Sequence, residues 1–341
     1  MKRQSALLAF LLKAAIGLGL LSIFLSRLDL GQFVQALTSA RFSYVVLALF
    51  LYLVGKLVTA VRWALLARPL GFANPLKDFV AFYYIGMFFN LFAPSTLGGD
   101  AGRIFYLSRG SPETAERGRA EAAALALASI LADRGMGMAV LVWIGAGALV
   151  VFPEYALLVP GAARYVTFTL AIGPIAAWAL FPFCHRLLRK IDHPLGKKLE
   201  ALGSAYWERQ GVLLQALGLS LAFHLMQIWI QIVVGQALGF NIPWPYAFVF
   251  FPLVDIVSML PVTLSGIGLR EGGYLFFLGK LGISPEKAVA CATLWLVVVV
   301  VSGLVGALAF VFYRGSAALP FGEARARSGE TGAERSAGEP G

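Results

Sequence analysis

Six long runs of apolar residues dominate this sequence. They cover roughly 6–28, 43–66, 121–151, 165–184, 211–239 and 286–313. Each run is long enough for a helix that crosses the ~30 Å hydrocarbon core of a bilayer, which takes ~20 residues. The runs are also unbroken, whereas the strands of an outer-membrane barrel alternate apolar and polar residues. The sequence therefore predicts an all-α polytopic membrane protein with about six transmembrane helices.

Composition excludes the main soluble classes. Hydrophobic residues make up 59% of the 341 residues and charged residues 13%, against about 45–50% and about 25% in a soluble domain. So few polar residues could not cover one soluble core, which excludes a soluble enzyme, a disordered protein, a coiled coil and a disulfide scaffold. The net charge of +10 fits cytoplasmic loops that face anionic lipid, so we expect no nucleic-acid partner. Two cysteines and three histidines show no metal-ligand spacing, so we expect neither a metal nor a cofactor.

Two further apolar segments, 78–97 and 246–264, are short and interrupted. Each ends in a break made of one proline and two glycines: Pro94, Gly98 and Gly99 in the first, and Pro261, Gly266 and Gly268 in the second. Because proline and glycine break helices, we interpret the two segments as re-entrant helical hairpins that enter and leave on the same side of the membrane.

The distribution of basic residues predicts the orientation. With a cytoplasmic N-terminus and two re-entrant hairpins, the cytoplasmic regions hold 19 of the 28 lysines and arginines, and the outer regions hold six. Full crossings by both short segments would move the basic loops 103–119 and 185–210 outside, against the positive-inside rule. We expect a multi-pass protein of the bacterial inner membrane with both termini cytoplasmic. An N-tail (1–5) precedes the membrane domain (6–313), and a polar, disordered tail (314–341) follows it.

The basic loop 185–210 contains an amphipathic pattern. Leu195, Leu199, Leu202 and Tyr206 recur at helical spacing, with lysines and acidic residues on other faces. We expect a helix that lies on the cytoplasmic leaflet, with docking of a partner as the alternative.

The two halves, 6–151 and 165–313, have the same layout. The spans before the short segments begin at 43 and 211, and the short segments at 78 and 246, each pair 168 residues apart. Three crossings in each half would turn the second copy upside down. This predicts the inverted repeat of secondary transporters, in which paired Gly/Pro-broken segments form the substrate site.

Each break is followed by an arginine, Arg103 or Arg270, nine residues after its proline. A broken helix frees backbone N–H groups, and an anion at a half-helix N-terminus satisfies them. We therefore expect both arginines to bind substrate, the alternative being interfacial anchors that reach the headgroups. Asn90 is expected to hydrogen-bond backbone freed by the first break.

Charged residues at membrane depth complete the candidate substrate site. A central Arg or Asp costs ~2.5–3.5 kcal/mol, so such residues must face a packed interior or a wet cavity. For Asp133 and Arg134 a purely structural pairing with neighbouring helices is an equal alternative. Besides Arg103, Arg270 and Asn90, the candidate site contains Asp100, Asp133, Arg134, Asp255 and Glu271.

Other polar residues in the spans have simpler interpretations. Lys56 and Arg62 near the end of the second span are expected to snorkel to the membrane surface. A stripe on one face of the fifth span is expected to hydrogen-bond to other helices, with a cavity lining as the alternative. Its members are Ser220, His224, Gln227 and Gln231.

Three stretches resemble a known family. NLFAPSTLGGDAGRIFYLSR (90–109), ILADRGMGM (130–138) and LPVTLSGIGLREGGYLFFLGKLGIS (260–284) resemble the membrane module of the lysylphosphatidylglycerol synthases, which also occurs alone in flippase-like membrane proteins. The resemblance covers roughly 8–313, and GIGLRE at 266–271 is its most specific part. It implies movement of a lipid headgroup, such as aminoacylated phosphatidylglycerol, between leaflets. Only 28 residues follow Tyr313, so the soluble aminoacyl-transfer activity of the full synthases is not expected.

The sequence thus predicts a lipid translocase without catalytic residues. Arg103, Arg270 and the hairpin amides would hold the lipid phosphate, and the acidic residues would hold a cationic headgroup or balance the arginines. One alternative is a membrane-embedded transferase for a lipid-linked substrate, with Asp133 or Glu271 as the base. The other is a non-catalytic membrane partner of a separate synthase.

Overall fold

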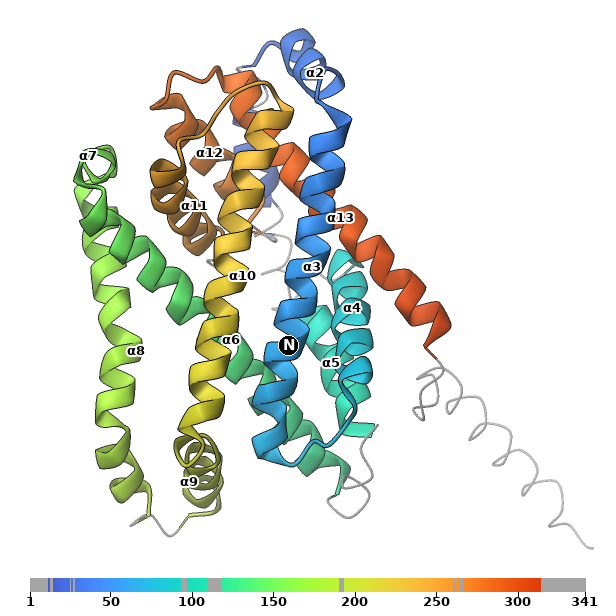
Figure 1. The fold of residues 1–341 in the computed structure, drawn as a ribbon, viewed down its shortest axis with the longest axis vertical. Helices are drawn as coiled ribbons and strands as arrows, with labels where there is room; N and C mark the ends of the chain where they lie inside the picture. Colours follow the sequence, from blue (N-terminus) through green and yellow to red (C-terminus); the bar gives the residue numbers. More distant parts are fainter. Residues whose placement is uncertain are drawn as a thin grey trace, which may run out of the picture.

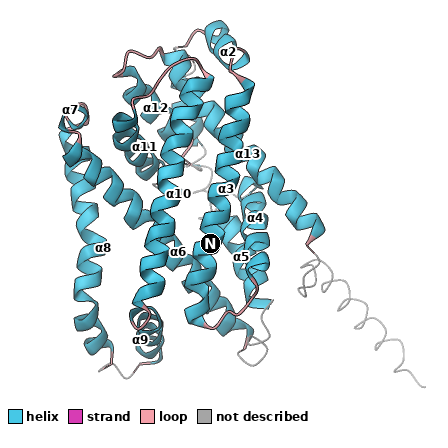
Figure 2. Cartoon of the chain, viewed as in Figure 1, coloured by secondary structure: helices cyan, strands magenta, loops and turns pink. Residues whose placement is uncertain are grey.

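The computed structural model describes residues 12, 15–24, 26, 28–92, 97–109, 118–189, 193–259, 262–263 and 266–313. Throughout these ranges the regular structure is helical, and no strand occurs in them (Figure 2). Pro94, Pro261, the N-tail and the predicted tail 314–341 lie outside the described residues.

The described chain contains five helices long and apolar enough to cross a membrane. They agree with five of the six predicted spans, which confirms a helical protein with several apolar helices. The described part of the remaining span, 6–28, is the short helix Ala15–Phe24, so the count of six stays a prediction. The five long helices are α3 (Phe42–Ala67), α6 (Arg119–Val151), α8 (Gly161–Leu188), α10 (Gln210–Ala237) and α13 (Pro285–Phe312).

The first short apolar segment forms two helices, α4 (Leu76–Phe92) and α5 (Leu97–Arg109). They pack antiparallel, because the Phe82 ring stacks on Tyr106 at 5.4 Å while Asn90, two turns later in α4, bonds to Gly99. In Figure 1 this pair occupies the lower half of the molecule.

The second short segment forms α11 (Trp244–Ser258), and α12 (Leu269–Gly279) follows it. This pair is also antiparallel: the Tyr246 hydroxyl donates to the carbonyl of Phe277 (2.7 Å), and Val254 lies against Gly273. The pair lies in the upper half of the molecule, opposite to α4 and α5 (Figure 1).

Helices α3 and α10 form a long antiparallel seam between these two pairs. At one end the Arg41 amide donates to the carbonyl of Ala237 (2.9 Å), and near the other Arg62 Nη1 donates to the hydroxyl of Ser220 (2.8 Å). The helices come close at Gly55, where a Cβ atom would lie 3.3 Å from the ring of Phe223. The seam therefore brings the two halves of the chain into direct contact.

The remaining helices are short: α2 (Leu30–Thr38), η1 (Arg68–Leu70), α7 (Pro153–Ala156) and α9 (Pro194–Trp207). Helix α9 confirms the helix predicted within 185–210. Its Tyr206 hydroxyl donates to the carbonyl of Leu66 (2.8 Å), and Trp207 stacks on Phe181 of α8 at 4.6 Å. Apolar side chains of α9 thus pack on other helices of the same chain.

Candidate functional site

A buried ion network joins the first hairpin to two long helices. The carboxylate of Asp133 on α6 accepts from Arg62 Nε on α3 (2.7 Å) and from Arg103 Nη2 on α5 (3.3 Å). All three residues are buried, with Asp133 only 2% exposed. Buried charges are tolerated when they are paired and hydrogen-bonded, so this carboxylate fixes α3 and α5 against α6.

The network continues toward one face of α6. Arg103 also lies 3.7 Å from Asp100, on the same face of α5, and Asp100 pairs with Arg134 at 2.7 Å. The Arg134 side chain is 41% exposed, so the network runs from the interior to a surface of the protein. We call these five residues, Arg62, Asp100, Arg103, Asp133 and Arg134, the arginine–aspartate network. With three arginines and two aspartates, it has an excess of one positive charge.

Aromatic rings hold Arg103 in place. Its guanidinium lies 4.0 Å from the ring centre of Trp63 and 4.6 Å from that of Tyr83. Such cation–π contacts strengthen where water is excluded. The indole N–H of Trp63 donates to the hydroxyl of Ser129 (3.0 Å), which orients this ring.

Arg62 does not snorkel, so that expectation is wrong. It is 4% exposed, and Asp133 and Ser220 accept its hydrogen bonds. Burying an unpaired arginine costs desolvation free energy, which favours a position at the surface. Here the carboxylate of Asp133 on α6 offsets that cost by pairing with the guanidinium. A sequence signal was present: Thr59, Arg62 and Trp63 follow one another at i, i+3 and i+4, which places them on one face of α3.

Helices α4 and α5 of the first hairpin approach each other closely at Asn90 and Gly99. Asn90 Oδ1 accepts from the backbone N–H of Gly99 (2.8 Å), the type of bond expected for a residue near a break. A Cβ atom on Gly99 would collide with the carbonyl oxygen of Gly86 and the side-chain amide of Asn90. Gly99 is therefore required for the close approach of α4 and α5, and Gly98 beside it is half-buried.

The second hairpin uses the positive-φ conformations that favour glycine. Gly266 has φ 76° and Gly268 has φ 85°. The buried carboxylate of Glu271 accepts from the N–H of Gly268 (2.6 Å) and so caps α12. A Cβ atom on Gly266 would lie 2.7 Å from the carbonyl oxygen of Ser258 at the end of α11. Glu271 thus satisfies a backbone donor for which the sequence predicts a ligand.

Arg270 and Asp255 belong to the second hairpin, and each is within electrostatic reach of the other. Both are half-buried. Arg103 lies on α5 and Arg270 on α12, and these two helices lie in opposite halves of the molecule (Figure 1). We call the surroundings of Arg103 and of Arg270 the two half-sites.

Lys56 lies in the seam between these half-sites. Its ammonium is 4.5 Å from the ring centre of Tyr52 and 4.8 Å from that of Phe223. It is also within electrostatic reach of Asp255 and of Tyr83, the ring that faces Arg103. Its position between two aromatic rings does not fit the expected snorkelling, so that expectation is wrong for Lys56 as well.

The polar stripe of α10 bonds to three different helices. Besides the bond from Arg62 to Ser220, His224 Nε2 donates to the carbonyl of Gly137 (2.9 Å), and the Tyr274 hydroxyl donates to Gln231 Oε1. This confirms interhelical bonding for three members. Within the described part of the chain, three buried atoms of this stripe lack a hydrogen-bond partner: His224 Nδ1, Gln227 Oε1 and Gln231 Nε2. Arg103 Nε on α5 also lacks one.

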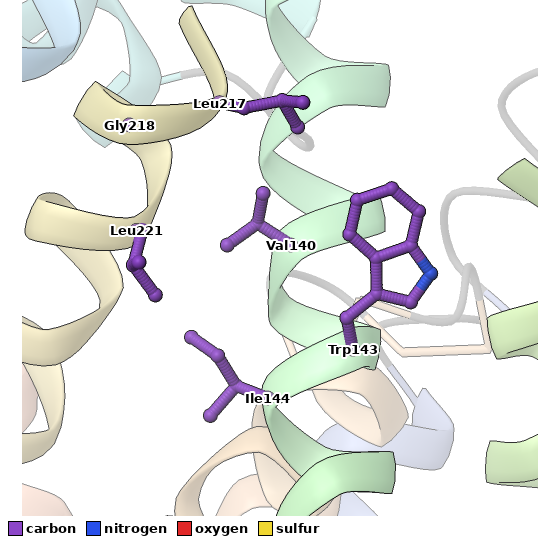
Figure 3. A pocket seen from close by; sticks show the side chains of 6 residues that line it. All are labelled: Val140, Trp143, Ile144, Leu217, Gly218 and Leu221. Atoms are coloured by element: carbon purple, nitrogen blue, oxygen red, sulfur yellow. The ribbon is translucent and has the colours of Figure 1, made fainter. Parts of the chain in front are cut away.

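An apolar groove of about 370 Å³ lies between α6 and α10 (Figure 3). Ligand sites have volumes of about 300–1,000 Å³. On α6, Val140 lies two turns after Asp133 of the network. On α10, Leu221 is exposed whereas its neighbour Ser220, which bonds to Arg62, is buried, so the groove opens on the exposed side of α10. The lining residues are Val140, Trp143 and Ile144 of α6 and Leu217, Gly218 and Leu221 of α10.

Helix α8 stands beside this groove. It packs on α6, where the Trp143 indole donates to the carbonyl of Ala171 (3.0 Å), and on α9. In Figure 1, α8 is separated from α10 along most of its length, with α6 crossing between them. Most of the central part of α8 is exposed apolar surface, which suits contact with lipid.

No group of three or more His, Cys, Asp or Glu side chains in the described ranges could hold a metal ion. The charged residues instead form ion pairs and helix caps. All of them lie within residues 10–323, which match the family model described as the lysylphosphatidylglycerol synthase TM region. The chain belongs to this family.

Relatives of this family member occur in archaea. The chain is 23% identical to a UPF0104 membrane protein of Methanothermobacter thermautotrophicus over 316 residues, which cover 85% of this chain and 89% of the relative. A second UPF0104 membrane protein, from Methanocaldococcus jannaschii, is 29% identical over 83 residues, about a quarter of each chain. These names describe membrane proteins and state no activity.

Proposed function

We propose that this protein is a lipid translocase that moves a phosphate-containing lipid between membrane leaflets. The observation that carries the proposal is a buried network with excess positive charge whose central carboxylate, Asp133, lies on α6, the helix that also lines an apolar groove. A phospholipid has the matching structure, with an anionic phosphate joined to apolar chains. The family name refers to a lipid, lysylphosphatidylglycerol, and aminoacylated phosphatidylglycerol is accordingly our first candidate substrate.

The proposal gives each part of the site a role. Arg103 would exchange part of its pairing with Asp133 for the lipid phosphate, since a guanidinium fork matches phosphate in two places. The groove between α6 and α10 would hold an acyl chain. Asp100, close to the exposed end of the network, would attract a cationic aminoacyl group.

The two halves are proposed to be inverted copies, with α4–α5 and α11–α12 as re-entrant hairpins. Helices α3 and α10 are equivalent in this scheme and run antiparallel. Gly55 and Phe223 touch across the seam, and they are 168 residues apart, the same spacing as between the short segments. Equivalent residues of two inverted copies touch where the two-fold axis passes, so the axis would run through this contact.

Orientation is part of the proposal. The basic loops and both termini would be cytoplasmic in a bacterial inner membrane, with anionic lipid at the loop surfaces.

The test is transport by the purified full chain in proteoliposomes that contain fluorescent phosphatidylglycerol or its lysyl ester. We expect exchange between leaflets faster than in protein-free vesicles. Equal rates in both would overturn the translocase and would leave the role of a membrane partner for a separate synthase. Turnover of a lipid-linked substrate in detergent, where leaflets are absent, would indicate a transferase.

The groove offers a matched pair of variants for the same assay. A Cβ atom on Gly218 or on Gly147 meets no atom within 4 Å, so a larger side chain fits at either position. Gly218→Phe would fill the groove and should slow exchange at least fivefold, while Gly147→Phe on α6 should leave it unchanged. Equal rates for the two variants would exclude the groove as an acyl-chain site.

A further inference from the structure

We infer that Lys56 binds the lipid phosphate midway between the half-sites of Arg103 and Arg270. The inference deepens the proposed function and rests on it. It adds a third cation to the path and places it at the boundary between the two halves of the molecule.

The seam gives Lys56 a central position. Lys56 follows Gly55, which touches Phe223 at the proposed axis. The residue 168 positions after Lys56 is His224, and the two side chains are within electrostatic reach of each other. Lys56 and His224 therefore flank the axis, where a bound group would be shared by both halves.

Lys56 also differs from the arginines of the network in its pairing. Arg62, Arg103 and Arg134 each have a carboxylate within 4.0 Å. Across the described ranges, Lys56 has no such ion pair, and aromatic faces of Tyr52 and Phe223 accompany its ammonium. Cation–π contacts stabilise the charge of the Lys56 ammonium, but its N–H groups can still donate hydrogen bonds to a phosphate oxygen.

The neighbours of Lys56 connect it to both half-sites. On one side Tyr83 is near Lys56 and faces Arg103 at 4.6 Å. On the other side Asp255 is within electrostatic reach of Lys56 and of Arg270. Lys56 therefore shares one neighbour with each arginine, Tyr83 with Arg103 and Asp255 with Arg270. In the proposed path an anion that moves from Arg103 to Arg270 contacts Lys56.

The chemistry of lysine suits an intermediate position. An ammonium binds phosphate as a point charge on a flexible stem, whereas the arginine fork holds it in two places. A ligand held by one centre is released more easily than one held by two. The unpartnered His224 Nδ1 and Gln227 Oε1 near the seam offer further polar contacts to a headgroup.

The first experiment compares lysine variants in the proteoliposome assay with fluorescent phosphatidylglycerol. Lys56→Gln should slow exchange at least tenfold, and Lys56→Arg should retain more activity than Lys56→Gln. The control is Lys280→Gln, because Lys280 is exposed and also faces an aromatic ring, that of Phe276 at 5.4 Å. An active wild type with an equally active Lys56→Gln variant would overturn this inference alone, whereas an inactive wild type would overturn the proposed function.

A second experiment uses the wild-type protein and so does not depend on folding of a variant. A membrane-permeant amine reagent modifies Lys56, and mass spectrometry of its peptide gives the rate. We expect phosphatidylglycerol to slow modification at least threefold relative to diacylglycerol, which has the same chains without phosphate. Equal rates with both lipids would overturn the inference, and equal protection by inorganic phosphate would overturn the assignment to a lipid headgroup.

Discussion

Asp133 is the residue on which the arginine–aspartate network depends. It is the carboxylate shared by Arg62 and Arg103, which come from α3 and α5. Removing one partner of a buried ion pair leaves an uncompensated charge, which is more destabilising than removing the whole pair.

We therefore expect Asp133→Asn to reduce the free energy of unfolding by about 3–5 kcal/mol, because two arginines lose their shared carboxylate. Thermal unfolding in detergent measures the change. Glu208→Gln is the control, since Glu208 is exposed on the protein surface. Equal melting temperatures for the two variants would contradict a structural role of the network.

Gly99 and Gly147 test whether the hairpin depends on close packing. Gly99→Ala should destabilise the protein, because its Cβ atom would meet the backbone of Gly86, which has no flexible side chain to move. Gly147→Ala should be neutral or stabilising by up to ~1 kcal/mol, since nothing lies within 4 Å of its Cβ position. The measurement is again thermal unfolding, and a more stable Gly99→Ala variant would show that α4 and α5 lie further apart.

At the scale of elements, α9 is held against α8 by aromatic stacking and by an ion pair. Glu200 accepts from Arg189 Nε (3.2 Å) and lies 3.0 Å from His185 Nε2. The hydrogen bond from Arg189 is the main reason that the pKa of Glu200 is below its ordinary value, and it outweighs the desolvation that would raise it.

This pairing predicts a pH dependence of α9 docking. A lowered carboxyl pKa means that the stabilisation is fully present above the ordinary value of about 4.3 and is lost as the pH falls through the lowered pKa. The hydrogen-exchange protection factors of the α9 backbone amides should therefore be lower at pH 3 than at neutral pH. Those of the α3 amides should be the same at both pH values. Glu200→Gln should give the faster exchange at neutral pH. Equal protection in the variant and the wild type would show that the Trp207 stack alone holds α9.

At the scale of the whole molecule, α2 and α9 lie at opposite ends (Figure 1). Thr38 on α2 and Glu208 after α9 are both exposed. After replacement of the exposed Cys184 and the buried Cys291, single cysteines at these positions report the orientation. An impermeant maleimide should label Thr38→Cys in intact cells and Glu208→Cys only after permeabilisation. The reverse pattern would invert the orientation, and labelling of both in intact cells would contradict a spanning arrangement.

The sequence by itself determined the elements of this protein. Five long helices lie within a few residues of the apolar runs, and Gly266 and Gly268 directly precede α12 as a break requires, whereas Gly98 and Gly99 lie in the first turn of α5. These features are local, since the length of an apolar run and the backbone preferences of glycine and proline act within one segment. The amphipathic helix within 185–210 followed from periodicity in the same way.

Only the tertiary structure decided which charges meet. Arg62 pairs with Asp133, 71 residues away, because α3 and α6 turn these faces toward each other. The rotation and crossing of helices depend on packing between distant segments, which no local pattern encodes. For the same reason, a Cβ atom on Gly145 would lie 3.2 Å from Pro252 whereas one on Gly147 would meet nothing within 4 Å, although both occur in one continuous helix. Lys56 lies beside the Phe223 ring because α3 and α10 pack along their length, and its position in the sequence gave no sign of that contact.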